Sequence, residues 1–424
     1  DVSGMMTADP RMVSHARQIP HISYKETMEL SHFGAKVIYP PTIQPVMNHH
    51  IPVWIKNTFE PDHHGTLIEA EVLKNGSVRG ISSVNGISLL SLEGSGMVGV
   101  PGFSKRLFEA LAGHSVNVIL ITQGSSEHSI CVGINEADEK RAILAVNDAF
   151  SYEINTGKVQ PLITEHDLAI VALVGDNMKS HPGISGKMFG AMGRNGINVR
   201  AIAQGSSERN ISAVIKTADV KKALNVLHEE FFETSYKVIN LFLAGVGNVG
   251  SRLITQLQKQ QAYLQQHLRL QIRVVGMGNS RHMLFSDKGI PLDKWKELLA
   301  EGDEMDLNRF IGIIREKNMR NAVFADITAN REIAMRYDDL LRKSISVVAC
   351  NKVACSSSYK YYRELKDLAR EFNSSFLFET NVGAGLPVIG TLNDLLRSGD
   401  KINKIEAVLS GTLNFVFNNY NVEK

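Results

Sequence analysis

The sequence is poor in several residue types that mark particular classes of protein. Among 424 residues there are only three cysteines and two tryptophans, and 7% are aromatic. So few cysteines exclude a disulfide-stapled secreted fold and fit a reducing compartment. The net charge is +2 without a basic run, and no apolar stretch approaches the roughly 18 residues of a membrane span. We therefore expect a cytoplasmic protein with no nucleic-acid or membrane partner.

What is present is typical of a globular chain. Hydrophobic residues make up 43% and charged residues 21%, enough to bury several cores. Cys131, Cys350 and Cys355 lie in or beside apolar runs. Because a zinc site at Cys350 and Cys355 would need a second ligand pair, we expect buried thiols instead. The chain begins with Asp1 and not Met, so we expect a piece of a longer protein.

A glycine-rich turn follows the buried, strand-like residues 238–244 and precedes the helix-like residues 251–258. Strand, turn and helix are the setting in which GxGxxG indicates a dinucleotide site, although a plain connection remains an alternative. Gly245 would allow the tight turn, Gly247 the approach of a pyrophosphate, and Gly250 the packing of helix on strand. The expected cofactor contacts are Gly245, Val246, Gly247, Asn248, Val249 and Gly250.

The second strand, residues 272–277, leads to Arg281 and not to an acidic residue. An acidic residue would accept a hydrogen bond from the ribose 2′-hydroxyl of NAD, whereas Arg281 could face the 2′-phosphate of NADP. The sequence therefore favours NADP over NAD. The alternative is that Arg281 is an ordinary surface residue in a loop.

Strand-like and helix-like segments alternate as far as residue 379, which predicts a parallel, doubly wound sheet of the Rossmann type. Ligands of such sheets bind at the carboxyl ends of the strands. This places Thr328, Asn351 and Lys352 near the cofactor, although Lys352 could also be an ordinary surface lysine.

An internal repeat precedes the Rossmann unit. Residues 92–134 align without a gap on residues 173–215, at a constant offset of 81. Each copy reads as a ferredoxin-like βαββαβ unit, and two such units can join their sheets edge to edge. The fold class is therefore α/β and α+β multidomain.

The repeat resembles tandem ACT domains, which sense amino acids. The Pro-Gly turns begin helices whose free N–H groups could hold an α-carboxylate, and amide side chains suit a ligand hydroxyl or ammonium group. The expected effector contacts are Gly102, Asn117 and Gln123 in the first copy and Gly183, Asn198 and Gln204 in the second. The alternative is that the amides only complete hydrogen bonds of the sheet.

The first residues, DVSGMMTADPR and then FGAKVIYP, resemble the C-terminal part of the aspartate kinase catalytic domain. The resemblance implies ATP with Mg²⁺ as the ligand. Its contacts by position are Asp1, Met6, Arg11, Lys36 and Val37. Met6 departs from the tyrosine usual in that family, and residues 1–37 could instead be only a docking surface.

The segments ETNVGAGLP and LSGTLN resemble homoserine dehydrogenase. The resemblance implies a monovalent cation, Na⁺ or K⁺, bound through Glu379, Val382, Ala384 and Leu386, and it places Thr412 near the nicotinamide. Lys352 matches the lysine that this family places near cofactor and substrate, which makes it our candidate catalytic residue. A glycine-rich hinge with Glu379 as a surface charge is the alternative.

Together these segments resemble the bifunctional aspartokinase/homoserine dehydrogenase family. Its layout implies a kinase end at 1–66, ACT domains at 67–157 and 158–236, a cofactor domain at 237–378 and the start of the dehydrogenase catalytic domain at 379–424. The family phosphorylates aspartate, reduces aspartate semialdehyde to homoserine, is usually inhibited by threonine and forms homo-oligomers, here a dimer or tetramer.

We expect the chain to bind cofactor and effector but to be incomplete for both reactions. Two other interpretations remain: a regulatory sensor and assembly hub without catalysis, and a different Rossmann dehydrogenase fused to ACT domains.

Overall fold

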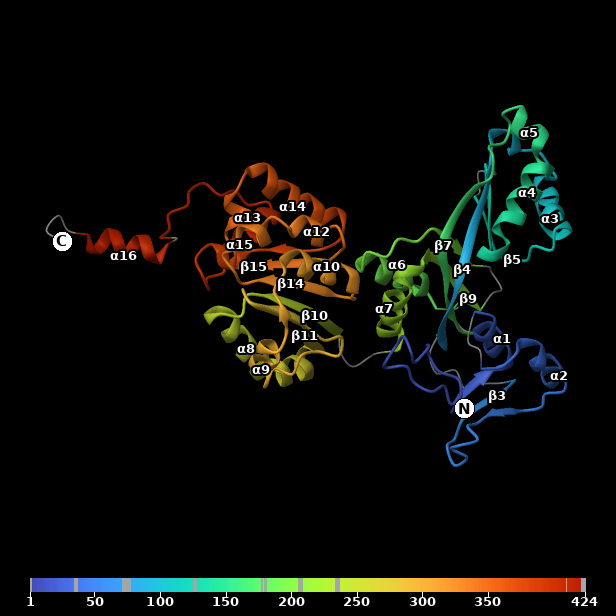
Figure 1. Ribbon diagram of the computed structural model, residues 1–424, viewed down its shortest axis with the longest axis horizontal. Coiled ribbons are helices and arrows are strands. Elements are labelled where there is room, and N and C mark those ends of the chain that lie inside the picture. Colours follow the sequence, from blue (N-terminus) through green and yellow to red (C-terminus); the bar gives the residue numbers. More distant parts are fainter. Residues whose placement is uncertain are drawn as a thin grey trace. The chain divides into compact units, whose positions relative to one another are not determined.

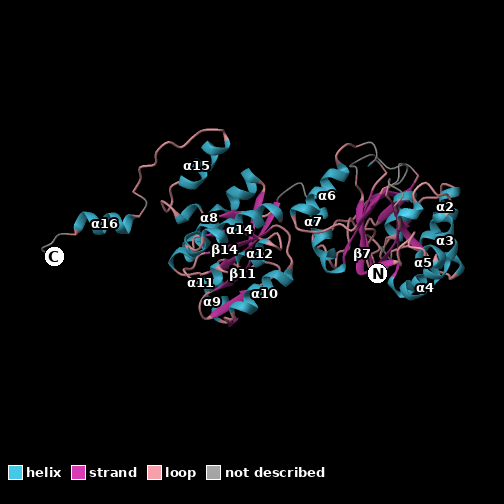
Figure 2. Cartoon of the chain, turned by 90° about the horizontal axis from the view of Figure 1, so that it is seen from above, coloured by secondary structure: helices cyan, strands magenta, loops and turns pink. Residues whose placement is uncertain are grey.

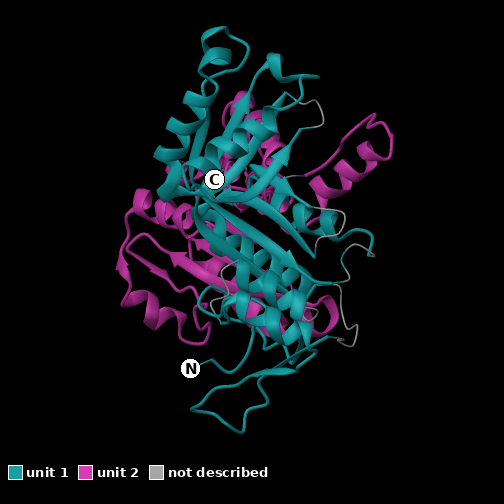
Figure 3. Cartoon of the chain, turned by 90° about the vertical axis from the view of Figure 1, so that its right-hand side faces the viewer, with its two compact units in different colours: residues 1–193, 197–234 teal, residues 194–196, 235–424 magenta. Residues whose placement is uncertain are grey.

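The chain forms two compact units, Asp1–Gly193 with Ile197–Thr234 and Arg194–Gly196 with Ser235–Lys424 (Figure 3). The computed structural model describes residues 2–33, 37–70, 78–124, 128–176, 178, 181–204, 209–232, 237–408 and 410–420. In these ranges, no helix combines the length and the apolar character needed to cross a membrane.

The first unit begins with a small sheet in the order β1-β3-β2. Its elements are β1 (His21–Ser23), α1 (Tyr24–His32), η1 (Pro40–Thr42), α2 (Ile43–Asn48), β2 (Val53–Ile55) and β3 (Thr66–Glu69). A capping box starts α1, because the Ser23 hydroxyl accepts the Glu26 N–H while the Glu26 carboxylate accepts the Ser23 N–H. The core of this sheet includes Val174 from the larger sheet described next, so the two sheets pack together.

The repeat forms one six-stranded sheet in the order β5-β6-β4-β7-β9-β8. The first copy contains β4 (Gly80–Glu93), η2 (Ser95–Met97), α3 (Phe103–Gly113), β5 (Val118–Gln123), β6 (Ser129–Asn135), η3 (Glu136–Asp138), α4 (Glu139–Ala149) and α5 (Ser151–Asn155). The second contains β7 (Ile163–Val174), α6 (Ile184–Arg194), β8 (Ala201–Ala203), β9 (Asn210–Lys216), η5 (Thr217–Asp219) and α7 (Val220–Phe232). The offset of 81 carries α3 onto α6 and β6 onto β9 residue for residue, which confirms the repeat.

The two copies share their first strands. β4 and β7 run antiparallel, side by side, from Gly80 opposite Val174 to Ser91 opposite Ile163 (Figure 1). In the order β5-β6-β4-β7, β7 is the fourth strand of the first ferredoxin-like unit; in β8-β9-β7-β4, β4 is the fourth strand of the second. Both predicted βαββαβ units are therefore present. Together they need only six strands, because the first strand of each unit also serves as the fourth strand of the other.

The second unit is the predicted doubly wound sheet, in the order β13-β12-β11-β10-β14-β15-β16. Its strands are β10 (Lys237–Ala244), β11 (Leu270–Gly278), β12 (His282–Phe285), β13 (Asp303–Glu304), β14 (Ala322–Asp326), β15 (Ser346–Ala349) and β16 (Phe376–Leu377). The pairs β11–β10, β10–β14, β14–β15 and β15–β16 are parallel, whereas β12 and β13 add an antiparallel edge that the sequence analysis did not predict.

Helices cover both faces of this sheet, as Figure 2 shows. They are α8 (Asn248–Leu268), α9 (Trp295–Ala300), α10 (Leu307–Lys317), α11 (Arg331–Ala334), α12 (Tyr337–Leu341), α13 (Val353–Ser356) and α14 (Tyr359–Glu371). One core joins α8 and α9 to the sheet, and the other joins α10, α12 and α14. After η6 (Glu379–Asn381), α15 (Val388–Arg397) and α16 (Gly411–Asn419) leave large apolar side chains exposed, among them Leu396, Phe415 and Phe417.

Candidate functional site

The glycine turn between β10 and α8 has the geometry that dinucleotide binding needs. Gly245 has a φ of +90°, and a Cβ there would lie 2.8 Å from the Ile327 carbonyl oxygen. A Cβ on Gly250 would collide with the Gly245 carbonyl oxygen, so this glycine allows the close packing of helix on strand. A Cβ on Gly247 would meet no atom within 4 Å. The open side of the turn is therefore at Gly247, where a pyrophosphate would approach the start of α8.

A cavity of about 530 Å³ lies beside this turn. Gly247, Arg281, His282, Trp295 and Lys296 line it, and none of its lining residues is acidic. The structure thus brings Arg281 to the cofactor turn and adds Lys296, which sequence reasoning missed. No spacing rule connects Lys296 to the turn, because α9 lies between β12 and β13, the two antiparallel strands at this side of the sheet.

At the neighbouring strand ends, the structure brings Thr328 and Asn351 together. The Asn351 amide nitrogen lies 3.5 Å from the Thr328 hydroxyl and 2.9 Å from a carboxylate oxygen of the buried Asp326. Lys352 follows at the start of α13 and is exposed. Sequence reasoning selected Thr328, Asn351 and Lys352 by their position at strand ends, but it missed Asp326 because an acidic residue inside the apolar run of residues 322–328 gave no separate signal.

The half-buried cysteines are free thiols. Burial raises the pKa of the Cys355 thiol, and the same cause raises the pKa of Cys131. Both thiols therefore stay protonated near neutral pH, so they are poor nucleophiles and poor metal ligands.

Glu379 is a helix cap in this structure. Its two carboxylate oxygens accept the N–H groups of Ile389 at 2.8 Å and Gly390 at 2.7 Å, in the first turn of α15. This differs from the surface charge considered above. The Glu379 carboxylate keeps further lone pairs, and a carboxylate is an oxygen donor of the kind that suits a hard cation, so this residue fits the expected ion. Ala384 in this turn has a φ of +52°, and Leu386 is exposed.

Thr412 is exposed near the start of α16, and the cavity beside the glycine turn does not include it. The structure therefore does not bring Thr412 to the residues expected around the cofactor.

In the first ACT-like copy, the Pro101-Gly102 turn and Gln123 line one pocket of about 280 Å³. Gly102 has a φ of +100° and precedes α3, and a Cβ on it would meet no atom within 4 Å. The pocket is open at the helix N-terminus, where a carboxylate would find N–H donors. Asn117 precedes β5 whereas Gln123 ends it, about 20 Å further along at 3.3 Å per residue. One small ligand cannot touch both amides of the same copy.

The second copy has the same arrangement. Gly183 has a φ of +90° before α6, and the Ser185 hydroxyl donates to the Gln204 side-chain oxygen at 3.0 Å. Gln204 therefore lies at the helix N-terminus, as Gln123 does. Asn198 is exposed before β8, at the far end of its strand.

The candidate ATP contacts are only partly described, because Asp1 and Lys36 lie outside the described residues. Met6 forms a β-bridge with Gln18, and Val37 packs against the core of the small sheet. The Arg11 side chain is 85% exposed, and Asp9 accepts its guanidinium hydrogen bonds, which lowers the pKa of Asp9. A phosphate group would have to compete with Asp9 for this guanidinium.

The same segment is docked on the second ACT-like copy. Thr7 Oγ1 lies 2.9 Å from Nε2 of the fully buried His228 on α7, and the Asn225 amide donates to the Met12 carbonyl at 2.9 Å. The Ser23 hydroxyl donates to Asp176 at 2.7 Å. These contacts hold the segment on the second copy, and they test neither the nucleotide role nor the alternative that the segment is only a docking surface.

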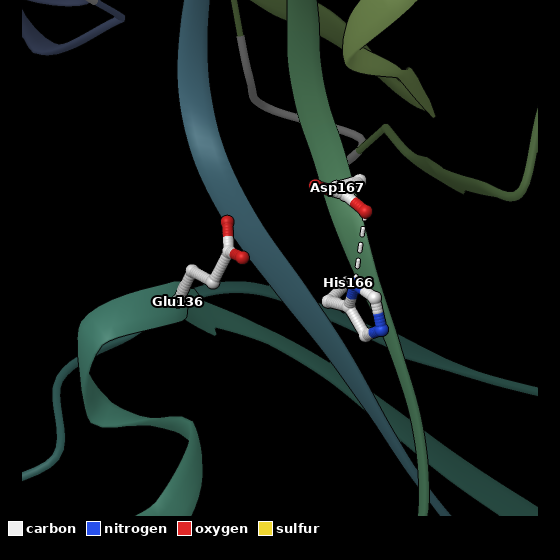
Figure 4. A group of neighbouring side chains, drawn as sticks. All are labelled: Glu136, His166 and Asp167. Carbon is white, nitrogen blue, oxygen red and sulfur yellow. Dashed lines mark hydrogen bonds and ion pairs between the residues drawn. The ribbon is translucent and has the colours of Figure 1, made fainter.

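A cluster of metal-ligand residue types lies elsewhere on the first unit. Glu136, His166 and Asp167 have ligand atoms within 4.8 Å of one another, and Figure 4 shows His166 bonded to Asp167 with Glu136 facing them from η3. All three residues are exposed. Exposed acidic groups gather without an ion in many proteins, so we assign no metal here.

Family models match the chain in the order that the sequence analysis expects. They are the amino acid kinase family at residues 1–57, the ACT domain at 90–150 and 171–231, the NAD binding domain of homoserine dehydrogenase at 245–379, and homoserine dehydrogenase at 387–424.

Curated relatives match almost the whole chain. A chloroplastic bifunctional aspartokinase/homoserine dehydrogenase 2 of Arabidopsis thaliana is 40% identical over 99% of this chain and 47% of its own length. The bifunctional enzyme of Haemophilus influenzae is 40% identical over 98% of this chain and 51% of its own length. A crystal structure of Clostridium acetobutylicum aspartate kinase matches with a TM-score of 0.50 at 30% identity, over 55% of this chain and 53% of that one.

The chain thus spans about half the length of the curated relatives it matches. The chain and these relatives share one order of segments. A kinase-like end comes first, then paired ACT units, a cofactor domain with a glycine turn, and the start of a dehydrogenase segment. The chain belongs to the bifunctional aspartokinase/homoserine dehydrogenase family.

Proposed function

We propose that this chain carries the regulatory and cofactor-binding centre of an enzyme with two activities. One activity transfers a phosphoryl group from ATP to aspartate, and the other reduces aspartate semialdehyde to homoserine with NADPH. The main support is the acid-free cavity that joins Gly247 to Arg281 and Lys296 in a chain of this family. A cavity with two basic side chains at the end of β11 suits a 2′-phosphate better than a 2′-hydroxyl.

For the dehydrogenase, NADPH supplies the hydride and the protein supplies orientation and charge. The N-terminus of α8 would hold the pyrophosphate. Arg281 and Lys296 would hold the 2′-phosphate, and Lys352 would lie near the substrate as the candidate catalytic residue. A monovalent cation, Na⁺ or K⁺, would be held by Glu379 with the carbonyl groups of Val382, Ala384 and Leu386. Thr412 would reach the nicotinamide only once the dehydrogenase domain is assembled.

For the kinase, Arg11 and Lys36 would offset phosphate charge while Asp1, Met6 and Val37 contact the nucleotide, and Mg²⁺ would supply further positive charge. We infer that the part present here turns over neither reaction well by itself. We also propose that the protein forms a homo-oligomer, a dimer or tetramer, and that it works in a reducing compartment such as the cytoplasm. The three free cysteines support the compartment.

The regulatory proposal is that threonine binds at the N-termini of α3 and α6. The pocket formed by Gly102 and Gln123, and the equivalent Gly183 and Gln204, support an amino-acid ligand with a carboxylate at the helix N-terminus. Asn117 and Asn198 would contact the effector only from a different site or a second copy, since each lies at the far end of its strand.

A second candidate function is a sensor and assembly hub without catalysis. The docking of Thr7 on His228 favours it, because this contact joins the first segment to α7 whether or not a nucleotide binds. Binding of an amino acid without binding of NADPH would select this candidate.

The test of the main proposal is calorimetric titration of the chain with NADPH and NADH. We expect tighter binding of NADPH, and we expect Arg281→Ala to remove most of that preference. Arg370→Ala is the matched control, because that arginine is 83% exposed on α14, remote from the cavity. Binding of neither nucleotide, or equal binding of both, would overturn the NADPH assignment.

A further inference from the structure

A buried carboxylate lies at the carboxyl end of the central strands, outside the residues assigned so far. Asp326 ends β14 and is fully buried. Its Oδ1 accepts the backbone N–H of Thr328 at 2.8 Å and the Thr328 hydroxyl at 2.7 Å. Its Oδ2 accepts the Tyr337 hydroxyl at 2.6 Å and the Asn351 amide at 2.9 Å. Four neutral donors from three segments therefore converge on one side chain.

The donor set requires a carboxylate with both oxygens free to accept. The N–H groups of Thr328 and Asn351 can only donate, and they reach different oxygens of Asp326. Burial, and then the nearby charge of Asp326, raises the pKa of Tyr337 far above its ordinary value, so its hydroxyl keeps its proton and donates. An asparagine in place of Asp326 would direct an NH₂ group at one of these donors.

Asp326 also acts on the glycine turn, through the Thr328 side chain that packs against it. A Cβ on Gly245 would lie 2.8 Å from the Thr328 methyl carbon, so this methyl group packs directly against the turn. Because Asp326 holds both the backbone and the hydroxyl of Thr328, the position of that methyl group depends on the carboxylate.

Through Asn351, the same carboxylate reaches the start of the dehydrogenase segment. The Asn351 amide nitrogen also donates to the Asn330 carbonyl at 2.8 Å, while its side-chain oxygen accepts the Val353 N–H at 3.1 Å. The Asn351 carbonyl accepts the Asn381 amide at 3.3 Å, and Asn381 belongs to η6. The side chain of Asn351 is thus held at both ends, with Asp326 as its charged partner.

We propose that Asp326 is a positioning residue of the cofactor site. It holds Thr328 under the glycine turn and Asn351 at the neighbouring strand end, and it does so before a nucleotide binds. The proposal rests on the cofactor site proposed above, because a nucleotide affinity is one of its two readouts. The other readout, the exchange of backbone amides in the free protein, does not depend on any nucleotide.

The test compares Asp326→Asn with two matched variants. Tyr337→Phe removes one donor to Asp326 but leaves both N–H bonds, and Leu340→Ala truncates a fully buried side chain of the same core without touching the carboxylate. Hydrogen–deuterium exchange reports the amides of Thr328 and Val353, and NADPH fluorescence reports the affinity. All measurements are made where circular dichroism shows each variant folded.

For Asp326→Asn, we expect at least tenfold faster exchange at both amides and at least a tenfold higher Kd for NADPH. Tyr337→Phe and Leu340→Ala are expected to melt at lower temperature while their Kd stays within about twofold of the parent. A Kd unchanged in Asp326→Asn, or raised equally in Leu340→Ala, would overturn the proposal, because the residue would then serve only the stability of the fold.

Two further outcomes are also decisive. If Asp326→Asn does not fold, Thr328→Val takes its place: it removes the hydroxyl bond but keeps the methyl group and the backbone N–H, and an unchanged Kd would overturn the proposal. If the parent chain binds no nicotinamide nucleotide, the proposed cofactor function fails. The positioning claim is then decided by exchange alone, and unchanged exchange in Asp326→Asn would sink it separately.

Discussion

Ser185 donates its hydroxyl hydrogen to the side-chain oxygen of Gln204 at the N-terminus of α6. The equivalent pair in the first copy, Ser104 and Gln123, lines an open pocket. A ligand of the second site that takes the place of the Ser185 hydroxyl on the Gln204 oxygen must first break a hydrogen bond that contributes about 1 kcal/mol. The two sites are therefore similar in sequence but not equally ready to bind.

We predict that Gln123→Ala and Gln204→Ala each remove one threonine-binding event, and that Ser185→Ala strengthens binding at the second site about fivefold, since about 1 kcal/mol is recovered. Calorimetric titration with threonine, and with lysine and methionine for comparison, measures this. If no amino acid binds, the repeat is structural or its sites need parts of the protein outside this chain.

The glycines of the cofactor turn offer a matched pair of substitutions. Gly247→Ala places a methyl group in open space, so we expect stability within about 0.5 kcal/mol of the parent but loss of NADPH binding. Gly250→Ala places it against the Gly245 carbonyl and should destabilise the second unit by about 2 kcal/mol or more. Thermal unfolding and NADPH titration separate the two effects. Retained binding in Gly247→Ala would show that the pyrophosphate is not held there.

The contact of Thr7 with His228 predicts how firmly the first segment is docked. Because His228 is fully buried, His228→Ala should lower the local opening free energy of residues 5–19 by about 2 kcal/mol. Hydrogen exchange of that segment measures it, and His64→Ala, an exposed position, serves as the control. Unchanged exchange would mean that the apolar contacts of Ala8 and Val13 dock the segment without this histidine.

Arg106 and Glu153 predict a pH dependence in the first unit. Arg106 Nη1 and Nη2 donate to the two Glu153 oxygens at 2.5 and 3.0 Å, and this bonding lowers the pKa of Glu153 although burial opposes it. A lowered pKa in the folded state means that the stabilisation is complete above the ordinary glutamate value and is lost as the pH falls through the lowered one.

Since the Arg106 side chain is 40% exposed, we expect Glu153→Gln to cost only about 0.5–1 kcal/mol at neutral pH. The variant and the parent should converge as the pH falls through the lowered pKa of Glu153, where the carboxyl group becomes protonated. Thermal melts over this range provide the measurement. Glu109→Gln, whose partner Lys105 is 76% exposed, should show little difference at any pH.

Glu379 makes a prediction about both α15 and the expected cation. Glu379→Gln can accept only one of the two N–H bonds, so the amides of Ile389 and Gly390 should exchange faster by a factor that reflects about 1–2 kcal/mol. Added Na⁺ or K⁺ should slow exchange in the parent if the ion binds here. No response to either ion would leave Glu379 as a helix cap alone.

Local patterns predicted much of this architecture. The constant offset of the repeat fixed helix and strand positions because apolar periodicity and Pro-Gly turns are local signals. The glycine spacing between residues 245 and 250 likewise predicted a turn that the structure confirms. Segment 168–174, LAIVALV, is apolar throughout because Ala169, Val171 and Leu173 pack under α6 and α7 while the alternate residues fill the core on the other face.

The features that sequence reasoning missed depend on contacts between distant segments. Lys296 joins the cofactor cavity through the fold of β12 and α9, and Asp326 acquires its role only from Tyr337 and Asn351. The exchange of fourth strands between the ACT units pairs residues as distant in sequence as Gly80 and Val174, which no local period records. Asn117 and Asn198 were grouped with Gln123 and Gln204 because each asparagine is close to its glutamine in sequence. In an extended strand, residues six positions apart lie far from each other in space.

The pairing of β4 with β7 determines whether one ACT unit can exist without the other. A single copy cut from the chain would expose the edge of its first strand and would have to borrow a fourth strand from another molecule. Such a copy is in effect half of a strand-exchanged dimer. Joining two copies in one chain turns that encounter into an intramolecular one with a high effective concentration. The pair is therefore an indivisible cooperative unit, and a change in either strand alters both sensors.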